Sequence, residues 1–73
     1  MLPTQCRAAR GLLDWSQAAL AERAKVSLSA LKNFEGGRST PIANNLAAIR
    51  TALESAGVIF LDNGEGPGVK LRK

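Results

Sequence analysis

Apolar residues recur every three or four positions through much of the first 57 residues, which is the spacing of one buried helix face. The first such face consists of Cys6, Ala9 and Leu13. We expect a helix over about residues 5–13, with Thr4 as its N-cap. Trp15 follows in a bend, and we expect its ring to lie against the core just before the next helix.

The next two helical patterns along the chain are shorter than the first. Ser16 and Ser27 each stand just before one of them, where a serine hydroxyl can accept a free N–H of the first helical turn. We therefore expect helices over residues 17–24 and 28–35, joined by a tight turn, the second stopped by Gly36-Gly37. The side chains expected to point inward are Leu20, Ala21, Ala24, Leu31 and Phe34.

A polar, glycine-rich loop follows and reaches Pro41, a residue that suits a turn or a first helical position. A fourth helix is expected to begin between Thr40 and Asn44, to end at Ala56 and to be stopped by Gly57. Its inward stripe is expected to be Leu46, Ile49, Leu53 and Ala56.

The last part of the chain changes character. Residues 58–61 are β-prone, residues 62–68 are rich in turn formers, and residues 69–72 alternate apolar with cationic side chains. This pattern predicts a β-hairpin. A turn at Asn63-Gly64 would put Gly66 and Pro67 inside the return strand, so we expect a longer loop, with residues 64–68 as part of the turn.

Composition agrees with a mainly α fold. The chain has 73 residues, of which 45% are hydrophobic and only 4% aromatic, which favours a core of small aliphatic side chains between helices. We expect one helical domain over residues 1–57 and a C-terminal β-hairpin over residues 58–73.

Charge and cysteine content indicate the kind of partner and the cellular compartment. Ten Lys and Arg against six Asp and Glu give a net charge of +4, which attracts polyanions. The single cysteine, Cys6, cannot form an internal disulfide, and no run of residues has the length of a membrane span or the pattern of a signal peptide. We therefore expect a cytoplasmic protein that does not enter a membrane.

The sequence offers little chemistry for catalysis. It has no histidine and one cysteine, so no metal site or nucleophile with its base can be assembled, and we expect neither an enzyme nor a cofactor. Cys6 is expected to act as a small core residue.

One spaced set of residues is typical of a family. The set consists of Arg10, Trp15-Ser16-Gln17, Leu20-Ala21, Val26-Ser27, Leu31, Glu35-Gly36 and Pro41. Over about residues 5–56 it resembles the helix-turn-helix of the phage Cro and repressor proteins, often called XRE-like regulators. The resemblance implies a compact four-helix domain of the lambda repressor type. In this family the second paired helix docks in the DNA major groove and the first crosses the backbone.

The resemblance assigns base reading to the helix over residues 28–35. The positions that read bases in relatives are occupied here by Leu28, Ser29 and Asn33. Leucine can contact a thymine methyl, whereas serine and asparagine can hydrogen-bond to base edges. The alternative is that these residues are simply the exposed side of a short helix.

Phosphate contacts are expected around this helix. At the start of the preceding helix, the Gln17 side chain and the free backbone N–H groups can both meet a phosphate. The candidates are Ser16, Gln17, Ser27, Lys32, Arg38, Ser39 and Asn44. A solvated helix end and loop is the alternative.

Two further features follow from the resemblance. Arg10 and Glu35 occupy the places of a partly buried ion pair that links the first helix to the end of the third. Lys25 departs from the family, which usually has glycine in the turn, and a positive φ there would cost lysine roughly 1 kcal/mol.

The C-terminal hairpin is expected to hold two copies of the chain together on a double-stranded DNA operator. The residues assigned to dimerisation are Val58, Ile59, Phe60, Leu61, Val69 and Leu71. Alternatively the hairpin packs on its own helices. The leading hypothesis is a homodimeric repressor; the others are an antitoxin or adaptor that holds a toxin or other protein through residues 58–61, and a non-specific architectural protein.

Overall fold

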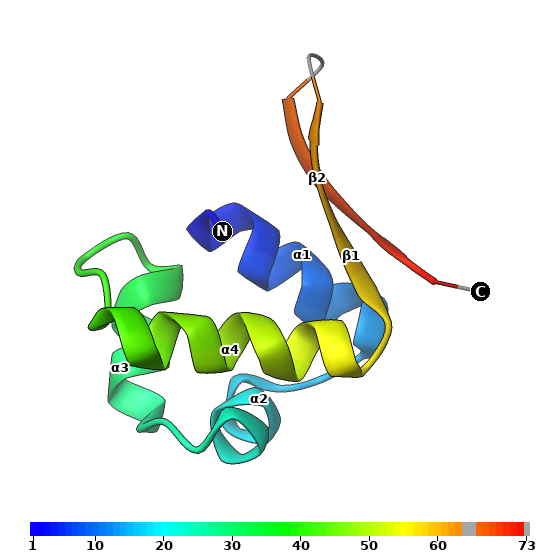
Figure 1. The fold of residues 1–73 in the computed structure, drawn as a ribbon. Coiled ribbons are helices and arrows are strands. Elements are labelled where there is room, and N and C mark those ends of the chain that lie inside the picture. Colours follow the sequence, from blue (N-terminus) through cyan, green and yellow to red (C-terminus); the bar gives the residue numbers. More distant parts are fainter. Residues whose placement is uncertain (64–65, 73) are drawn as a thin grey trace.

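The computed structural model describes residues 1–63 and 66–72. Within these ranges the chain forms four helices followed by a two-stranded antiparallel hairpin, which confirms the predicted fold class (Figure 1). The elements are α1 (Pro3–Leu13), α2 (Gln17–Ala24), α3 (Leu28–Glu35), α4 (Ala43–Ser55), β1 (Val58–Asn63) and β2 (Gly66–Leu71).

The two serine caps begin α2 and α3 as predicted. Ser16 Oγ accepts the Ala19 N–H at 3.0 Å, and Ser27 Oγ accepts the Ala30 N–H at 3.1 Å. Each bond satisfies one of the N–H groups that have no partner within their own helix. The start of each helix is therefore fixed by residues within three positions of it.

The prediction that Thr4 caps the first helix was wrong. α1 begins at Pro3, so that Thr4 lies inside it, and Leu2 is the flanking residue. Proline suits the first helical position because the N–H that it lacks would have no helical partner. The Leu2 N–H is accepted instead by Gln5 Oε1 at 2.8 Å.

The core lies between the four helices and the base of the hairpin. Its buried apolar residues are Cys6, Ala9, Leu20, Ala21, Ala24, Leu31, Phe34, Ile49, Leu53 and Val58. Trp15, Leu13 and Leu46 pack against this set while keeping part of their surface in solvent. Ala56 was wrongly expected in the inward stripe: α4 ends at Ser55, and Ala56 is its exposed C-cap.

The hairpin register corrects the expected long loop. Asp62 pairs with Pro67 and Asn63 with Gly66, so Gly66 and Pro67 belong to the return strand. Proline is tolerated because each strand of a two-stranded sheet has an outer edge, where an N–H needs no partner within the sheet. Residues 64 and 65, which were expected to belong to the turn, lie outside the described residues.

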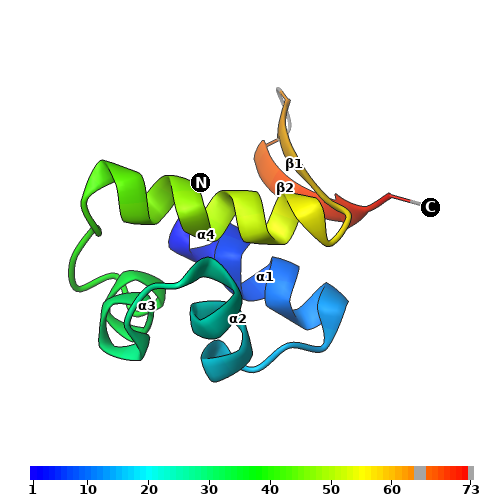
Figure 2. The same cartoon turned by 60° about the horizontal axis from the view of Figure 1, so that its bottom comes forward.

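The hairpin packs on α1 and α4, on the side of the helical body opposite α2 and α3 (Figures 1 and 2). Gln5 Nε2 donates to the backbone carbonyls of Leu61 at 3.2 Å and Gly68 at 3.1 Å, which ties α1 to both strands. Val58 is 3% exposed and belongs to the core of its own chain. Val58 therefore leaves almost no surface of its own for a second copy to contact.

Candidate nucleic-acid interface

The paired helices α2 and α3 present a polar face beside their connecting turn. Leu28, Ser29 and Lys32 are exposed on α3, with 37% of Leu28 accessible, while Asn33 is half-buried. Leu31 and Phe34 of the same helix point into the core. α3 is therefore anchored on one side and open on the other, as a helix that enters a groove must be.

Asn33 contacts Arg38, which lies in the loop after α3. Its Oδ1 lies 3.5 Å from Arg38 Nη1, at the outer limit of a hydrogen bond, whereas its backbone carbonyl accepts the Arg38 N–H at 2.9 Å. The loop after α3 thus folds back on this residue. Within the described residues the Asn33 side-chain N–H groups have no acceptor, which leaves part of the hydrogen-bonding capacity of this amide for a base edge.

The turn between α2 and α3 contains the strained residue that the sequence indicated. Lys25 has φ of 60° and ψ of 42°, the left-handed conformation, and its N–H bonds to the carbonyls at the end of α2. Lysine therefore adopts the left-handed conformation that glycine adopts with less steric strain.

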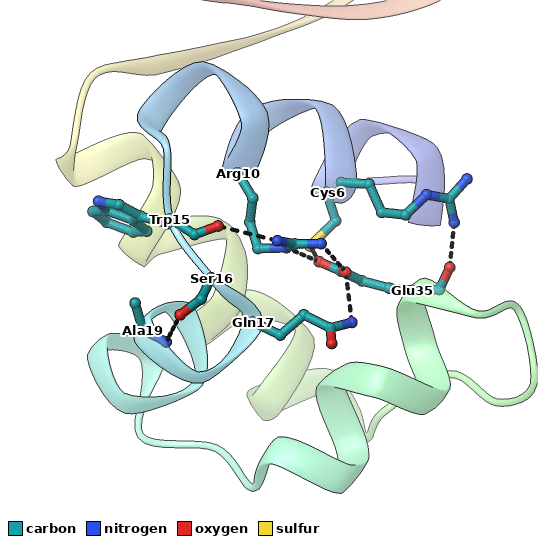
Figure 3. A network of polar contacts seen from close by, with 8 residues as sticks. Cys6, Arg10, Trp15, Ser16, Gln17, Ala19 and Glu35 are labelled. Carbon is teal, nitrogen blue, oxygen red and sulfur yellow. Dashed lines mark hydrogen bonds and ion pairs between the residues drawn. The ribbon is translucent and has the colours of Figure 1, made fainter.

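Glu35, at the end of α3, is the centre of a buried polar network (Figure 3). Its carboxylate accepts hydrogen bonds from Arg10 Nε at 2.8 Å, Arg10 Nη2 at 2.7 Å, Gln17 Nε2 at 3.0 Å and Cys6 Sγ at 3.1 Å. The Glu35 side chain is 1% exposed and that of Arg10 is 19% exposed. This network joins α1, the start of α2 and the end of α3, and so fixes the two paired helices relative to the rest of the domain.

Protonation in the network follows from these contacts. Burial by itself raises the pKa of Glu35, but the hydrogen bonds from Arg10, Cys6 and Gln17 outweigh it, so the pKa lies below its ordinary value. The hydrogen bond to Glu35 raises the pKa of Arg10, although burial opposes this. Burial, and then the neighbouring carboxylate, raise the pKa of Cys6 far above the usual thiol range, so the thiol keeps its proton.

A cationic pocket opens beside this network. It has a volume of about 500 Å³ and is lined by Arg7, Arg10, Gln17, Lys32, Glu35, Gly36 and Arg38. Arg7 donates from its guanidinium to the backbone carbonyl of Glu35, and the Glu35 carboxylate is occupied by its own donors. Four cations around one satisfied carboxylate leave the pocket electropositive, which suits a phosphate group.

The structure places the sequence-derived candidates unequally around this pocket. Gln17, Lys32 and Arg38 line it, whereas Ser39 and Asn44 are exposed elsewhere on the loop and on α4. The hydroxyls of Ser16 and Ser27 are engaged as helix caps, although both residues are exposed.

Two residues of this region were missed. Arg7 belongs to the pocket, and its position three residues before Arg10 on the same helix was the available signal. Cys6 was expected to be a simple core residue, yet its thiol donates to Glu35. No local pattern indicates a contact between residues 29 positions apart in the sequence.

Two negative findings apply to the described part of the chain. No group of three or more His, Cys, Asp or Glu residues there is arranged to hold a metal ion. No helix formed by these residues is both long and apolar enough to cross a membrane.

Comparison with known proteins agrees with this geometry. A family model described as helix-turn-helix matches residues 7–56, the stretch that runs from Arg7 in the cationic pocket to the end of α4. No match was found among curated proteins.

Proposed function

Since the chain belongs to the XRE-like helix-turn-helix family of DNA-binding regulators, we propose that it is a transcriptional repressor that binds a specific double-stranded operator as a homodimer. In this proposal α3 enters the major groove, with Leu28, Ser29 and Asn33 facing the bases. The observation that carries it is the open face of α3 beside the cationic pocket.

The proposed contacts divide into two classes. Ser29 and Asn33 supply hydrogen-bonding groups and Leu28 an apolar one, and these would read base edges. Gln17, Lys32 and Arg38, with Arg7 added, surround a space suited to one backbone phosphate, which would set the register of α3. Phosphate contacts from Ser16, Ser27, Ser39 and Asn44 remain part of the proposal because all four residues are exposed, although none of them lines the pocket.

Dimerisation is proposed through the hairpin. Leu71 is 37% exposed and Ile59 and Leu61 are half-buried, so apolar surface remains after the hairpin has packed on its own helices. Phe60 and Val69 contribute less because they already pack against the core. The outer edges of β1 and β2 can pair with a second copy, and a two-fold dimer would place two α3 helices on half-sites about 34–36 Å apart.

The same apolar surface supports a second candidate function. An antitoxin or adaptor would use Ile59, Leu61 and Leu71 to hold a toxin or other protein and would use DNA binding to regulate its own expression. The two functions differ in what the apolar surface of the hairpin binds, which is a second copy of the chain in the repressor and another protein in the antitoxin or adaptor.

Selection of binding sites from random double-stranded DNA near physiological salt tests the proposal. We expect a two-fold symmetric site, with base preferences that shift in the variants Ser29→Ala and Asn33→Ala. Ser55→Ala, at the far end of α4, is the matched control and should leave the preferences unchanged. If no site is enriched over background, sequence-specific regulation is excluded and an architectural or partner-binding role is favoured.

A further inference from the structure

A second surface of the domain shares only one residue, Asn44, with the proposed DNA contacts. A groove of about 600 Å³ runs between the end of α2 and the outer face of α4. Figures 1 and 2 show these two helices side by side, and no residue of α3 lines the groove. It is therefore separate from the base-reading face.

The floor of the groove is made of small side chains on α4. Ala47, Thr51 and Ser55 are exposed along it, and they recur every four residues, so they lie on one face of the helix. Small side chains allow the backbone of another helix to come close. The lining extends from Asn44 to Ala56, which at 1.5 Å per residue is about 18 Å, or three helical turns.

The opposite wall is aromatic and cationic. Trp15, Arg23 and Lys25 line it, and the Arg23 guanidinium lies over the Trp15 ring at 4.3 Å from its centroid. All the residues that line the groove are described, and none of them is acidic. Neither cation forms an ion pair within the described residues. The wall thus offers an apolar ring and two positive charges with no carboxylate to balance them.

Of the two cations, Lys25 gives the stronger argument for a binding role. It occupies the left-handed position of the α2–α3 turn, where glycine would be accommodated with less strain, and its side chain lines the groove. Glycine there would remove the charge from this wall. The residue that strains the turn is therefore the same residue that places a positive charge on the groove.

We propose that this groove binds an acidic amphipathic helix of a partner protein, about three turns long, while α3 remains free for DNA. The apolar side of that helix lies on the small residues of α4 and on Trp15, and its carboxylates face Arg23 and Lys25. A second copy of this chain is a poorer occupant, because a two-fold contact through this surface would bring the cations of both copies together.

Trp15 provides a direct readout, because it is the only tryptophan of the chain. The probes are three capped peptides of about 14 residues. One is an amphipathic helix of Leu and Glu, the second has Lys in place of Glu, and the third is a scrambled version of the first. We expect saturable quenching or a shift of Trp15 emission with the Leu–Glu helix only. No saturable change with that helix, or an equal change with the scrambled peptide, overturns the proposal.

Variants locate the binding. Ala47→Gln places a longer, neutral side chain on the exposed floor and should weaken binding roughly tenfold or more, because it fills part of the space that the partner helix occupies. Lys25→Gln should weaken it about two- to fivefold, the range expected for one exposed ion pair. The matched control is Lys32→Gln, which removes the same charge from α3 and should leave the affinity unchanged.

Further outcomes overturn the assignment. Equal losses in Lys25→Gln and Lys32→Gln would indicate only the general attraction of a basic protein for a polyanion. No loss in Ala47→Gln would place the peptide outside the groove. A Trp15 signal that changes with protein concentration in the absence of peptide, and that Ala47→Gln abolishes, would identify a second copy as the occupant.

Discussion

The Arg10 guanidinium and the Glu35 carboxylate meet through two parallel hydrogen bonds, Nε to Oε2 at 2.8 Å and Nη2 to Oε1 at 2.7 Å. Arg10 also donates from Nη1 to the Trp15 carbonyl at 3.0 Å. One side chain therefore binds both the end of α3 and the segment that connects α1 to α2. The orientation of α2 and α3 therefore depends on this pair, although neither residue is proposed to touch a base.

Glu35→Ala should destabilise the domain by about 3–5 kcal/mol, because it leaves the largely buried Arg10 without its partner. For a domain of this size each 1 kcal/mol shifts the melting temperature by about 4–8 °C, so a fall of more than about 10 °C is expected. Thermal unfolding followed by circular dichroism measures it. A fall of only one or two degrees would show that the pair does not act as a buried one.

Glu54→Ala is the matched control for that variant. Glu54 pairs with Arg50 within α4, at 3.0 Å, but its side chain is 46% exposed. Solvent screens such a pair, so the change in unfolding free energy should stay below about 1 kcal/mol. The difference between the two variants then reports burial rather than the loss of a carboxylate.

Acid should remove the stabilisation that Glu35 provides. Its pKa is lower in the folded state than in the unfolded chain, so below the ordinary glutamate pKa of about 4.3 the unfolded state binds the proton first. The contribution is complete above that pH and is lost as the pH falls through the lower, folded value. Urea unfolding between neutral pH and about pH 2.5 should show a smaller acid loss of stability in Glu35→Gln than in the wild type. Parallel profiles would contradict this.

Lys25→Gly should stabilise the domain by up to about 1 kcal/mol, because glycine adopts the left-handed conformation without the steric cost that lysine has at φ of 60°. Lys25→Ala keeps that cost and should not stabilise. Chemical denaturation of both variants measures the difference. Equal stabilities would mean that the turn relaxes around the side chain.

Arg7→Gln should reduce the salt dependence of operator binding. If Arg7 and its neighbours hold one phosphate, the loss of that contact lowers the slope of log K against log salt by about one. Arg72→Gln removes the same charge at the exposed end of the hairpin, outside the pocket, and should change the slope much less. Equal slopes in the two variants would assign the effect to net charge alone.

Leu71→Glu should convert a dimer into monomers if the hairpin forms the interface. Leu71 is 37% exposed, so the substitution should leave the monomer folded, whereas truncation after Gly57 would also remove Val58 from the core. Sedimentation equilibrium measures the mass, and circular dichroism checks the fold. A variant that stays dimeric would place the interface elsewhere.

The helices were largely predictable because their signals are local. Ser16 and Ser27 bond to N–H groups three residues ahead, and the inward positions of Leu20, Leu31, Ile49 and Leu53 follow from helical spacing. The start of α1 was misplaced by two residues because two local signals compete there: Thr4 as a cap and Pro3 as a first helical residue. The family resemblance also indicated the strained turn, which the φ angle of Lys25 confirms.

What the sequence determined by itself was the set of elements, the family and the residues on the open face of α3. Only the tertiary structure decided that Gly66 and Pro67 pair within the hairpin, that Val58 belongs to the helical core, and that Gln17 and Cys6 donate to Glu35. For the Glu35 network the physical reason is sequence separation. A cap or a helix face depends on residues a few positions apart, whereas the bonds of Gln17 and Cys6 to Glu35 join residues 18 and 29 positions apart and exist only once the chain has folded around them.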